Sequence, residues 1–145
     1  MVDKRIINYI KEHHILTLAT SNNNKSYCCT CFYVYLEDVN MFVITSDRNT
    51  KHVNDIMKQN YVSGAIALET KIVGKIRGIQ FTGTIEELTG NELIPSIRDA
   101  KKKYFKKFPF AILKQTLLWG IKPDFIKMTD NRLGFGKKLI WHQNY

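Results

Sequence analysis

The 145-residue sequence has no apolar run of the roughly 18 residues that a membrane-spanning helix needs. Its first residues also lack the uninterrupted apolar core of a signal peptide, because Ile6, Ile7 and Ile10 alternate with acids and bases as in an amphipathic helix. Internal repeats and low-complexity linkers are absent. We therefore expect one cytoplasmic domain over residues 1–145, without a membrane partner.

The sequence has few cysteines, and they are too close together for a metal site. Cys28, Cys29 and Cys31 lie in the apolar run YCCTCFYVYL, where neighbouring residues of a strand point to opposite faces. A metal centre needs separated ligands with a spacing such as C-x-x-C. We expect small thiols that fill strand positions, and no metal. The core side of this strand is expected to carry Cys28, Thr30, Phe32, Val34 and Leu36.

Acidic residues are scarce in the second half of the chain. Residues 1–70 hold seven Lys or Arg and seven Asp or Glu, whereas residues 71–145 hold fifteen and six. The densest basic segment, RDAKKKYFKKF over 98–108, could contact nucleic acid phosphates. The favoured interpretation is a helix with aromatic side chains on one side and solvated lysines on the other, so nucleic acid binding is not expected.

Hydrophobic patterns predict the order helix, three strands, helix, two strands, helices, two strands. Short turns join most neighbours, which only antiparallel strands allow, so we expect an α+β domain built on an antiparallel barrel. Pro95 either kinks the third helix or starts another. The expected helices are 3–13, a helix from 51, a region opened by a Thr89–Glu92 capping box and a short helix over 110–117; the expected strands are 15–20, 26–36, 41–45, 61–70, 74–88, 119–128 and 133–141.

The segment ITSDRNTKH, residues 44–52, is a strand-to-helix junction crowded with hydroxyls and cations. Such a junction either caps the helix, through Asn49 or Thr50, or holds an anion. Lys51 in the first turn is unfavourable to the helix dipole unless an anion compensates it. This local conflict favours an anion site.

Three segments resemble the pyridoxamine 5′-phosphate oxidase-like FMN-binding split barrels. Residues 26–56, SYCCTCFYVYLEDVNMFVITSDRNTKHVNDI, are similar to the opening of that superfamily, and GKIRGIQFTGTIEEL over 74–88 is similar to its central strand. The C-terminal TDNRLGFGKKLIW, residues 129–141, resembles the narrower YhbP-like group of small proteins. The resemblance implies an α+β antiparallel split β-barrel of about six to seven strands with flanking helices.

The same resemblance implies FMN as the cofactor. The positions that match the phosphate-binding junction are Thr45, Ser46, Thr50 and Lys51. A helix N-terminus supplies unpaired N–H groups, hydroxyls add donors and a lysine adds a full charge, which suits a phosphate.

The matching part of the central strand supplies the other expected cofactor-binding residues. Gly78 stands where the oxidase has a glutamine near the flavin ring, with Arg77 before it and Gln80 two positions later. Split barrels of this type resemble one another in binding flavin at a homodimer interface. The resemblance therefore implies a homodimer in which both chains form each site.

Departures from the oxidase pattern argue against pyridoxamine phosphate oxidation itself. Residues 27–35 have no Lys or Arg where the oxidase has a basic pair, and its late Trp and Arg are not clearly reproduced. No catalytic acid or base is assigned. His52, next to Lys51, is a candidate site residue, although a histidine on a surface helix is the commoner interpretation. Two hypotheses remain: an FMN-dependent oxidoreductase of unknown small-molecule substrate, or a non-catalytic dimeric module that binds flavin, haem or another anionic ligand.

Overall fold

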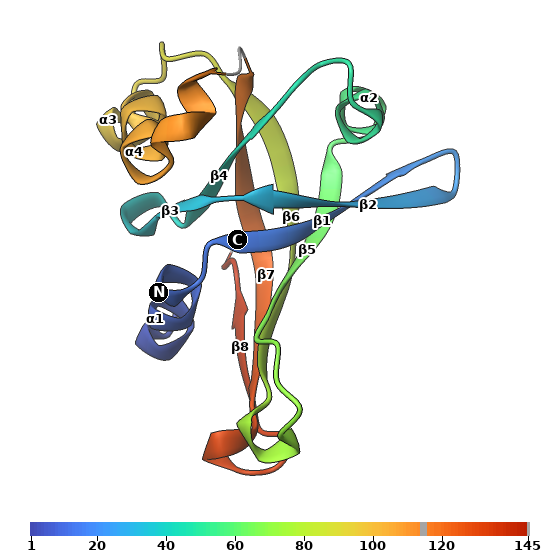
Figure 1. The fold of residues 1–145 in the computed structure, drawn as a ribbon, viewed down its shortest axis with the longest axis vertical. Coiled ribbons are helices and arrows are strands. Elements are labelled where there is room, and N and C mark those ends of the chain that lie inside the picture. The colour runs from blue at the N-terminus through green and yellow to red at the C-terminus, as the bar shows by residue number, and fades with distance from the viewer. Residues whose placement is uncertain (114–115, 145) are drawn as a thin grey trace.

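The computed structural model describes residues 1–113 and 116–144. It shows an α+β fold in which two long strands, β6 and β7, run the length of the molecule and helices flank the sheet (Figure 1). The elements are α1 Lys4–Glu12, β1 Ile15–Asn22, β2 Lys25–Phe32, β3 Val34–Leu36, η1 Glu37–Val39, β4 Met41–Ser46, α2 Lys51–Lys58, β5 Tyr61–Ala67, η2 Val73–Lys75, β6 Arg77–Leu88, α3 Pro95–Arg98, α4 Ala100–Lys107, η3 Pro109–Leu113, β7 Leu117–Asp130, η4 Asn131–Leu133 and β8 Lys138–His142.

Within the described residues, eight strands form one antiparallel sheet. Its order is β2-β1-β5-β6-β7-β4-β3, and β8 pairs with the C-terminal half of β7. The strands at the two ends of this path, β2 and β3, are halves of one segment interrupted only at Tyr33. The sheet therefore curls until its ends meet, which confirms the expected antiparallel split barrel.

The barrel is filled by the inward side chains of nearly all its strands. Phe42 of β4 stacks on Phe81 of β6 with ring centroids 4.6 Å apart. Helix α1 packs Ile6, Tyr9 and Ile10 against this core, as the isoleucine spacing predicted. A smaller apolar cluster outside the barrel receives α4: Val34, Leu36, Met41, Val43, Ala100, Tyr104 and Leu118.

The break at Tyr33 corrects the expectation of one strand over 26–36. The predicted core face was wrong for β2, where Cys28, Thr30 and Phe32 are exposed and Cys31 is buried. It was right for Val34 and Leu36 of β3. Because Tyr33 and Val34 are both buried, the inward and outward alternation shifts by one residue at the break.

The glycine-containing strand β6 carries a bulge. The register with β7 shifts between Thr82 and Gly83, and Gly83 lies opposite Pro123. A Cβ on Gly83 would stand 2.3 Å from the carbonyl oxygen of Lys122, so only glycine fits there. The bulge lets β7 keep a proline within a central strand, because the ladder is already irregular at that point.

The expected helix start at the Thr89–Glu92 capping box is wrong. Glu92 does accept hydrogen bonds from the Thr89 and Gly90 amides, at 2.6 and 2.9 Å, but these residues form a turn. The helix begins at Pro95, in the first-turn position that suits proline. The helix expected over 110–117 is also corrected, since η3 ends at Leu113 and β7 starts at Leu117; Lys114 and Gln115 lie outside the described residues.

Candidate ligand-binding pocket

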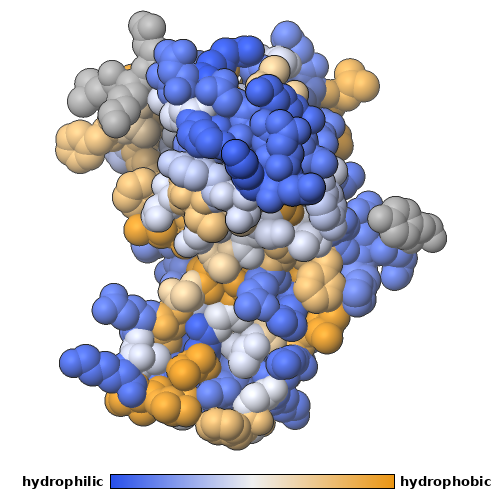
Figure 2. Space-filling model, turned by 90° about the vertical axis from the view of Figure 1, so that its right-hand side faces the viewer, coloured by the Kyte–Doolittle hydropathy of each residue, from blue (hydrophilic) through white to orange (hydrophobic). Residues whose placement is uncertain are grey.

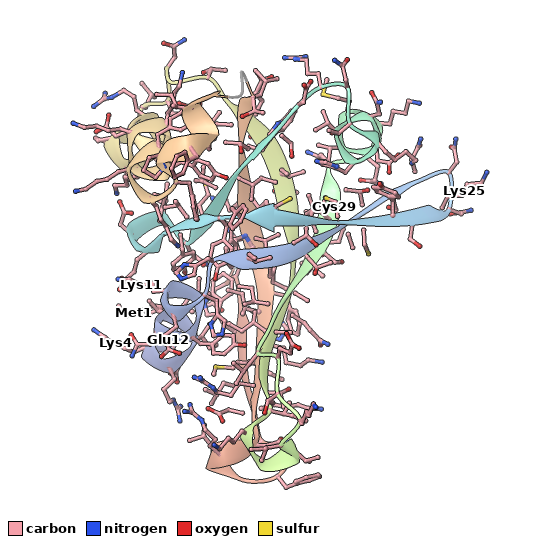
Figure 3. The ribbon with its side chains drawn as sticks, in the orientation of Figure 1. Met1, Lys4, Lys11, Glu12, Lys25 and Cys29 are labelled. Carbon is pink, nitrogen blue, oxygen red and sulfur yellow. The ribbon has the colours of Figure 1, made fainter. Side chains whose placement is uncertain are left out.

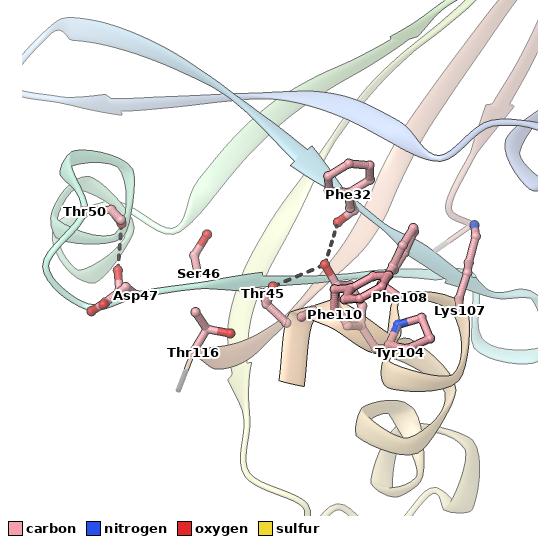
Figure 4. Close-up of a pocket in the computed structure, with 12 residues that line it drawn as sticks. Phe32, Thr45, Ser46, Asp47, Thr50, Tyr104, Lys107, Phe108, Phe110 and Thr116 are labelled. Carbon is pink, nitrogen blue, oxygen red and sulfur yellow. Dashed lines mark hydrogen bonds between the residues drawn. The ribbon is translucent and has the colours of Figure 1, made fainter. Parts of the chain in front are cut away.

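A pocket of about 1170 Å³ opens where β4 ends and α2 begins, and α4 and η3 close its other side (Figure 4). Its position is that of the strand-to-helix junction singled out in the sequence. The lining residues are Phe32, Thr45, Ser46, Asp47, Thr50, Tyr104, Lys107, Phe108, Pro109, Phe110, Ala111 and Thr116.

Hydroxyl groups on β4 connect the two walls of the pocket. Thr45 donates a hydrogen bond to the Tyr104 hydroxyl at 3.2 Å, and Tyr104 donates to the Phe32 carbonyl at 3.4 Å (Figure 4). Burial raises the pKa of Tyr104, so its hydroxyl stays protonated and able to donate. Ser46 Oγ and His52 Nε2 share a 2.7 Å hydrogen bond. Thr45 and Ser46 are thus held in place on the pocket wall.

Thr50 caps helix α2, as one of the two sequence interpretations proposed. Its hydroxyl accepts from the Val53 amide at 3.3 Å and donates to the Asp47 carbonyl at 2.7 Å. The Asn54 amide bonds to the Thr50 carbonyl at 3.1 Å. Among the described residues no acceptor is recorded for the first-turn amides of Lys51 and His52, so capping leaves two N–H donors at this helix end.

Among the described residues, the opposite wall of the pocket is aromatic and carries one cation, Lys107. The rings of Phe32 and Phe108 lie 5.2 Å apart, and Phe110 is strongly exposed. Lys107 Nζ donates to the Tyr33 carbonyl at 3.2 Å and lies 5.3 Å from the centre of the Phe108 ring. Desolvation lowers the pKa of Lys107. A planar ligand at this wall would meet ring faces with an ammonium group beside them.

Lys51 does not line the pocket and is already paired. Its ammonium group bonds both carboxylate oxygens of Asp55, at 2.7 and 2.8 Å, one helical turn later. Asp55 is buried and also accepts from Thr20 Oγ1 at 3.0 Å. The hydrogen bond from Lys51 lowers the pKa of Asp55, with Thr20 adding to that effect against the opposing burial. The first-turn lysine that conflicted with the helix dipole is thus compensated within the chain.

The hydroxyl donors of the pocket suit an anionic group, and the described lining adds one cation and one carboxylate. The pocket contains the Asp47 side chain, whose Oδ1 accepts from the Asn49 amide at 3.0 Å, and the cation Lys107. Thr116 Oγ1 is buried in its wall without a partner among the described residues. A ligand with hydrogen-bonding oxygens would satisfy this hydroxyl.

Arg77 lies far from the junction. It begins β6, whose other end, Leu88, is connected through Leu118 of β7 to Thr45. Leu88 is eleven positions after Arg77, which is roughly 35 Å along the strand. Arg77 bonds Glu12 of α1 at 3.2 Å. Within one chain it cannot reach the pocket.

Gly78 and Gln80 share this distant location. Gly78 pairs with Ala67 and Thr129, and Gln80 pairs with Ala65 and Lys127. Gln80 lies beside a separate, mostly apolar hollow of about 400 Å³ on β1, β5 and β6. The seven sequence-predicted cofactor residues therefore form two separate groups: Thr45, Ser46, Thr50 and Lys51 at the junction, and Arg77, Gly78 and Gln80 at the far end of β6.

The pocket contains residues that sequence reasoning did not assign to a site. Tyr104, Lys107 and Phe108 come from the basic, aromatic segment 98–108, for which an amphipathic helix was the favoured interpretation, and Phe110 comes from the segment expected to form a short helix over 110–117. The mixture of rings and lysines over 98–108 was a signal for a binding wall, but nothing in the sequence showed that it would face β4. Thr116 carried no signal of its own.

The turn that joins β7 to β8 forms the other polar end of the molecule. Asp130 is buried, and Arg132 bonds it at 2.8 Å; the Asn131 side chain donates to the Val73 carbonyl at 2.8 Å. We call η2 and the turn over 131–137, which begins with η4, together the tip. Viewed from the right of Figure 1, hydrophobic side chains gather at this lower end (Figure 2). Arg132 is thus engaged in closing the turn.

In the described part of the chain, no group of three or more His, Cys, Asp or Glu side chains could hold a metal ion. No helix among residues 1–113 and 116–144 is long and apolar enough to cross a membrane.

The chain has close relatives among bacterial proteins. A UPF0306 protein of Klebsiella pneumoniae (strain 342) is 37% identical over 136 residues, which cover 94% of this chain and 90% of that protein. A UPF0306 protein of Photorhabdus laumondii is 35% identical over 135 residues, covering 93% and 92%. No protein-family model matches the chain.

Solved structures with the same fold bind different ligands. A haem-binding protein from Mycobacterium smegmatis matches 92% of this chain with a TM-score of 0.74 at 13% identity, although the match spans only 54% of that protein. A pyridoxamine 5′-phosphate oxidase-related, FMN-binding protein from Nostoc punctiforme has a TM-score of 0.65 at 14% identity, covering 90% and 81%. An FAD-binding protein from Mesorhizobium loti has a TM-score of 0.69 at 12% identity, covering 88% and 92%. These likenesses confirm the split-barrel resemblance for the fold.

Proposed function

The chain belongs to the UPF0306 family, and we propose that it is an FMN-binding flavoprotein that uses the pocket between β4, α2 and α4. One observation supports this most: hydroxyls and a helix N-terminus face an aromatic wall across a single cavity. FMN has both a phosphate and a planar ring, and the two walls suit these two parts. Structural neighbours that bind FMN or FAD give the proposal further support.

The polar wall would hold the phosphate. Thr45, Ser46 and Thr50 place their hydroxyls along it, and the amides of Lys51 and His52 point out of the first turn of α2. The Lys51 ammonium group neutralises Asp55, so the contribution of Lys51 to the phosphate is through its amide. These groups bind and orient the ligand.

The aromatic wall would hold the ring and supply the missing charge. Phe108 and Phe110 offer ring faces, and Lys107 places an ammonium group beside them. Flavin supplies hydride or electron transfer when it is bound. The side chains here position the ligand and shield one face of it from water. In this proposal the protein is an oxidoreductase that acts on a small-molecule substrate.

The distant residues Arg77, Gly78 and Gln80 lead to a proposal about assembly. Roughly 35 Å along β6 separates them from the junction, so they can join this site only from a second subunit. We propose a homodimer in which β6 of one chain completes the pocket of the other. In mixed dimers of Lys107→Ala and Arg77→Ala chains, one site would receive both defects and the other neither. Such dimers should recover about half the FMN stoichiometry, whereas no recovery on mixing would refute shared sites.

Ligand retention tests the proposed function. Purified protein is mixed with FMN, riboflavin or haemin, passed through gel filtration and examined by visible absorbance. We expect FMN to be retained at about one per chain and riboflavin, which lacks the phosphate, to be lost. Retention of both flavins equally would remove the phosphate assignment, and retention of neither would refute flavin binding.

The same experiment tests the alternative of a non-catalytic binding module. The haem-binding neighbour favours it, as does a pocket whose described lining holds one cation and one carboxylate. Retention of haemin alone would establish this alternative in place of FMN.

A further inference from the structure

A second cluster of chemically active side chains lies beside the pocket, where β2 packs against α2. Cys29 Sγ and Cys31 Sγ are 3.8 Å apart on the same face of β2. Figure 3 shows Cys29 along β2, well away from the hairpin end marked by Lys25. The two thiols are in contact, and neither lines the proposed flavin site.

His52 connects these thiols to the pocket wall. Its Nε2 atom lies 2.7 Å from Ser46 Oγ and 3.4 Å from Thr50 Oγ1, and both hydroxyls line the pocket. The same ring lies close enough to Cys29 to act on its ionisation. The cluster of Cys29, Cys31 and His52 therefore borders the cavity.

The two thiols differ in acidity because each affects the other. The hydrogen bond from Cys31, followed by the effect of His52, lowers the pKa of Cys29 to about 5 against the opposing burial. The contact with Cys29, together with burial, raises the pKa of Cys31. Cys29 is also the less buried of the two, and an ionised sulfur is favoured where it is less buried. We therefore assign Cys29 as the thiolate and Cys31 as its S–H donor.

The groups around Cys29 do not reverse this assignment. Helix α2 contributes His52 and Lys51, the latter held by Asp55 and 5.3 Å from the centre of the Tyr27 ring. On β1 the residue opposite Cys29 is apolar Leu18. Helix α4 contributes Tyr104, which lies near Cys31 and stays neutral. None of these groups places an unpaired negative charge beside Cys29, because Asp55 is bonded to Lys51.

We propose that Cys29 is a reactive thiolate site for peroxides and other soft electrophiles at the flank of the pocket, with Cys31 and His52 as its positioning residues. With a peroxide, Cys29 Sγ attacks one peroxide oxygen and an S–O bond forms as the O–O bond breaks. The sulfur is oxidised by two electrons to sulfenic acid, and the departing oxygen takes a proton and leaves as water or an alcohol. If Cys31 Sγ then attacks this sulfur, an S–S bond forms and water leaves.

Cys28 provides a control within the same strand. It is exposed, whereas Cys29 is partly buried and Cys31 is buried. If exposure alone decided reactivity, Cys28 would react first at every pH. If the cluster decides it, Cys29 reacts first in acid, where an isolated thiol is protonated.

Alkylation by iodoacetamide, followed residue by residue by mass spectrometry, distinguishes these cases without any ligand. Near pH 5.5 an ordinary thiol is only about one part in a thousand thiolate. A thiol with a lowered pKa has a much larger thiolate fraction at this pH, but its thiolate is a weaker nucleophile, which removes most of the gain in rate. We therefore expect Cys29 to be labelled roughly tenfold faster than Cys28. Faster labelling of Cys28 across the whole pH range would overturn the proposal.

Variants test the two positioning residues. Cys31→Ala should move the midpoint of the Cys29 pH profile upward, and Cys31→Ser should restore part of the shift because a hydroxyl also donates. His52→Gln should raise the midpoint by a smaller amount, and it serves as a second test if Cys31→Ala does not fold. A Cys29 profile that no folded variant shifts would show that these residues do not activate it.

Peroxide gives the chemical product. After treatment with hydrogen peroxide and then dimedone, we expect oxidation at Cys29, found as a dimedone adduct or as a disulfide to Cys31. Oxidation confined to Cys28 and methionines would overturn the proposal. Because no flavin takes part, failure of this test would leave the proposed FMN site unaffected, and the reverse also holds.

Discussion

The two ends of the β6–β7 ribbon use their polar side chains differently. At the tip, Arg132 bonds buried Asp130, and Asn131 joins η4 to η2, so these polar side chains find their partners there. At the pocket end, formed by α2, α4 and η3, Lys51 likewise neutralises buried Asp55. A cavity remains there, with hydroxyls on one wall and rings on the other.

This difference teaches that a cluster of cations in a sequence is weak evidence for an anion site. Arg77, Lys51 and Arg132 each have a carboxylate partner within the chain. The cation at the pocket, Lys107, comes instead from a helix far along the sequence. What separates a site from a stable turn is the space left between the walls and the donors that face it.

The largest expected effect is on stability at the pocket end. Trp119 is buried, and its Nε1 donates to the Ser46 carbonyl at 3.2 Å. Trp119→Ala should lower the free energy of unfolding by about 3–5 kcal/mol, because it leaves a cavity and removes a donor. The matched change at the tip, Leu133→Ala, removes a half-exposed side chain and should cost less than about 1 kcal/mol. Urea unfolding measures both, and equal costs would show that the two ends are packed alike.

The next effect is on ligand affinity. Lys107→Ala should raise the Kd for FMN roughly tenfold to hundredfold, since a charge-assisted hydrogen bond contributes about 1.5–3 kcal/mol. Lys103→Ala on the same helix and Arg132→Ala at the tip are the controls, and both should leave the Kd unchanged. Fluorescence titration gives the values. A loss of affinity in Arg132→Ala alone would move the site to the tip.

A third effect involves one buried carboxylate at each end. The hydrogen bond from Lys51 lowers the pKa of Asp55, and that from Arg132 lowers the pKa of Asp130. A carboxyl pKa that is lowered on folding stabilises the folded protein at pH values above the unfolded pKa, about 3.9. This stabilisation is lost as the pH falls below that value and through the folded pKa. Stability should therefore drop below about pH 4 in urea unfolding. Asp55→Asn and Asp130→Asn should each reduce the loss of stability below about pH 4. If the pH dependence of unfolding is unchanged in either variant, the ion pair of that residue does not contribute to it.

The smallest effect concerns backbone conformation at the tip. Gly136 has φ +71°, which an alanine adopts only at a cost of about 1 kcal/mol. Gly74, in η2, has no positive φ and open space around it, so Gly74→Ala should be nearly neutral. Thermal unfolding of the two variants compares them directly. Equal melting temperatures would mean that the tip relaxes around position 136.

The sequence was sufficient for most of the fold because alternation and turn residues are local signals. It missed the break at Tyr33, since an uninterrupted apolar run hides a shift of face. At the site it predicted the hydroxyls of the junction. The ion pair Lys51–Asp55 was also readable, from its one-turn spacing. The wall from α4 was not predictable, because the packing of Tyr104 against Thr45 joins residues that are distant in the chain.

Amide chemical shifts on addition of FMN test the central claim most directly, because they report both ends of the molecule at once. The account predicts saturable shifts at Thr45, Thr50 and Phe110, with the Leu133 and Gly136 amides unmoved. Shifts confined to the tip, or no shifts at saturating FMN, would contradict it.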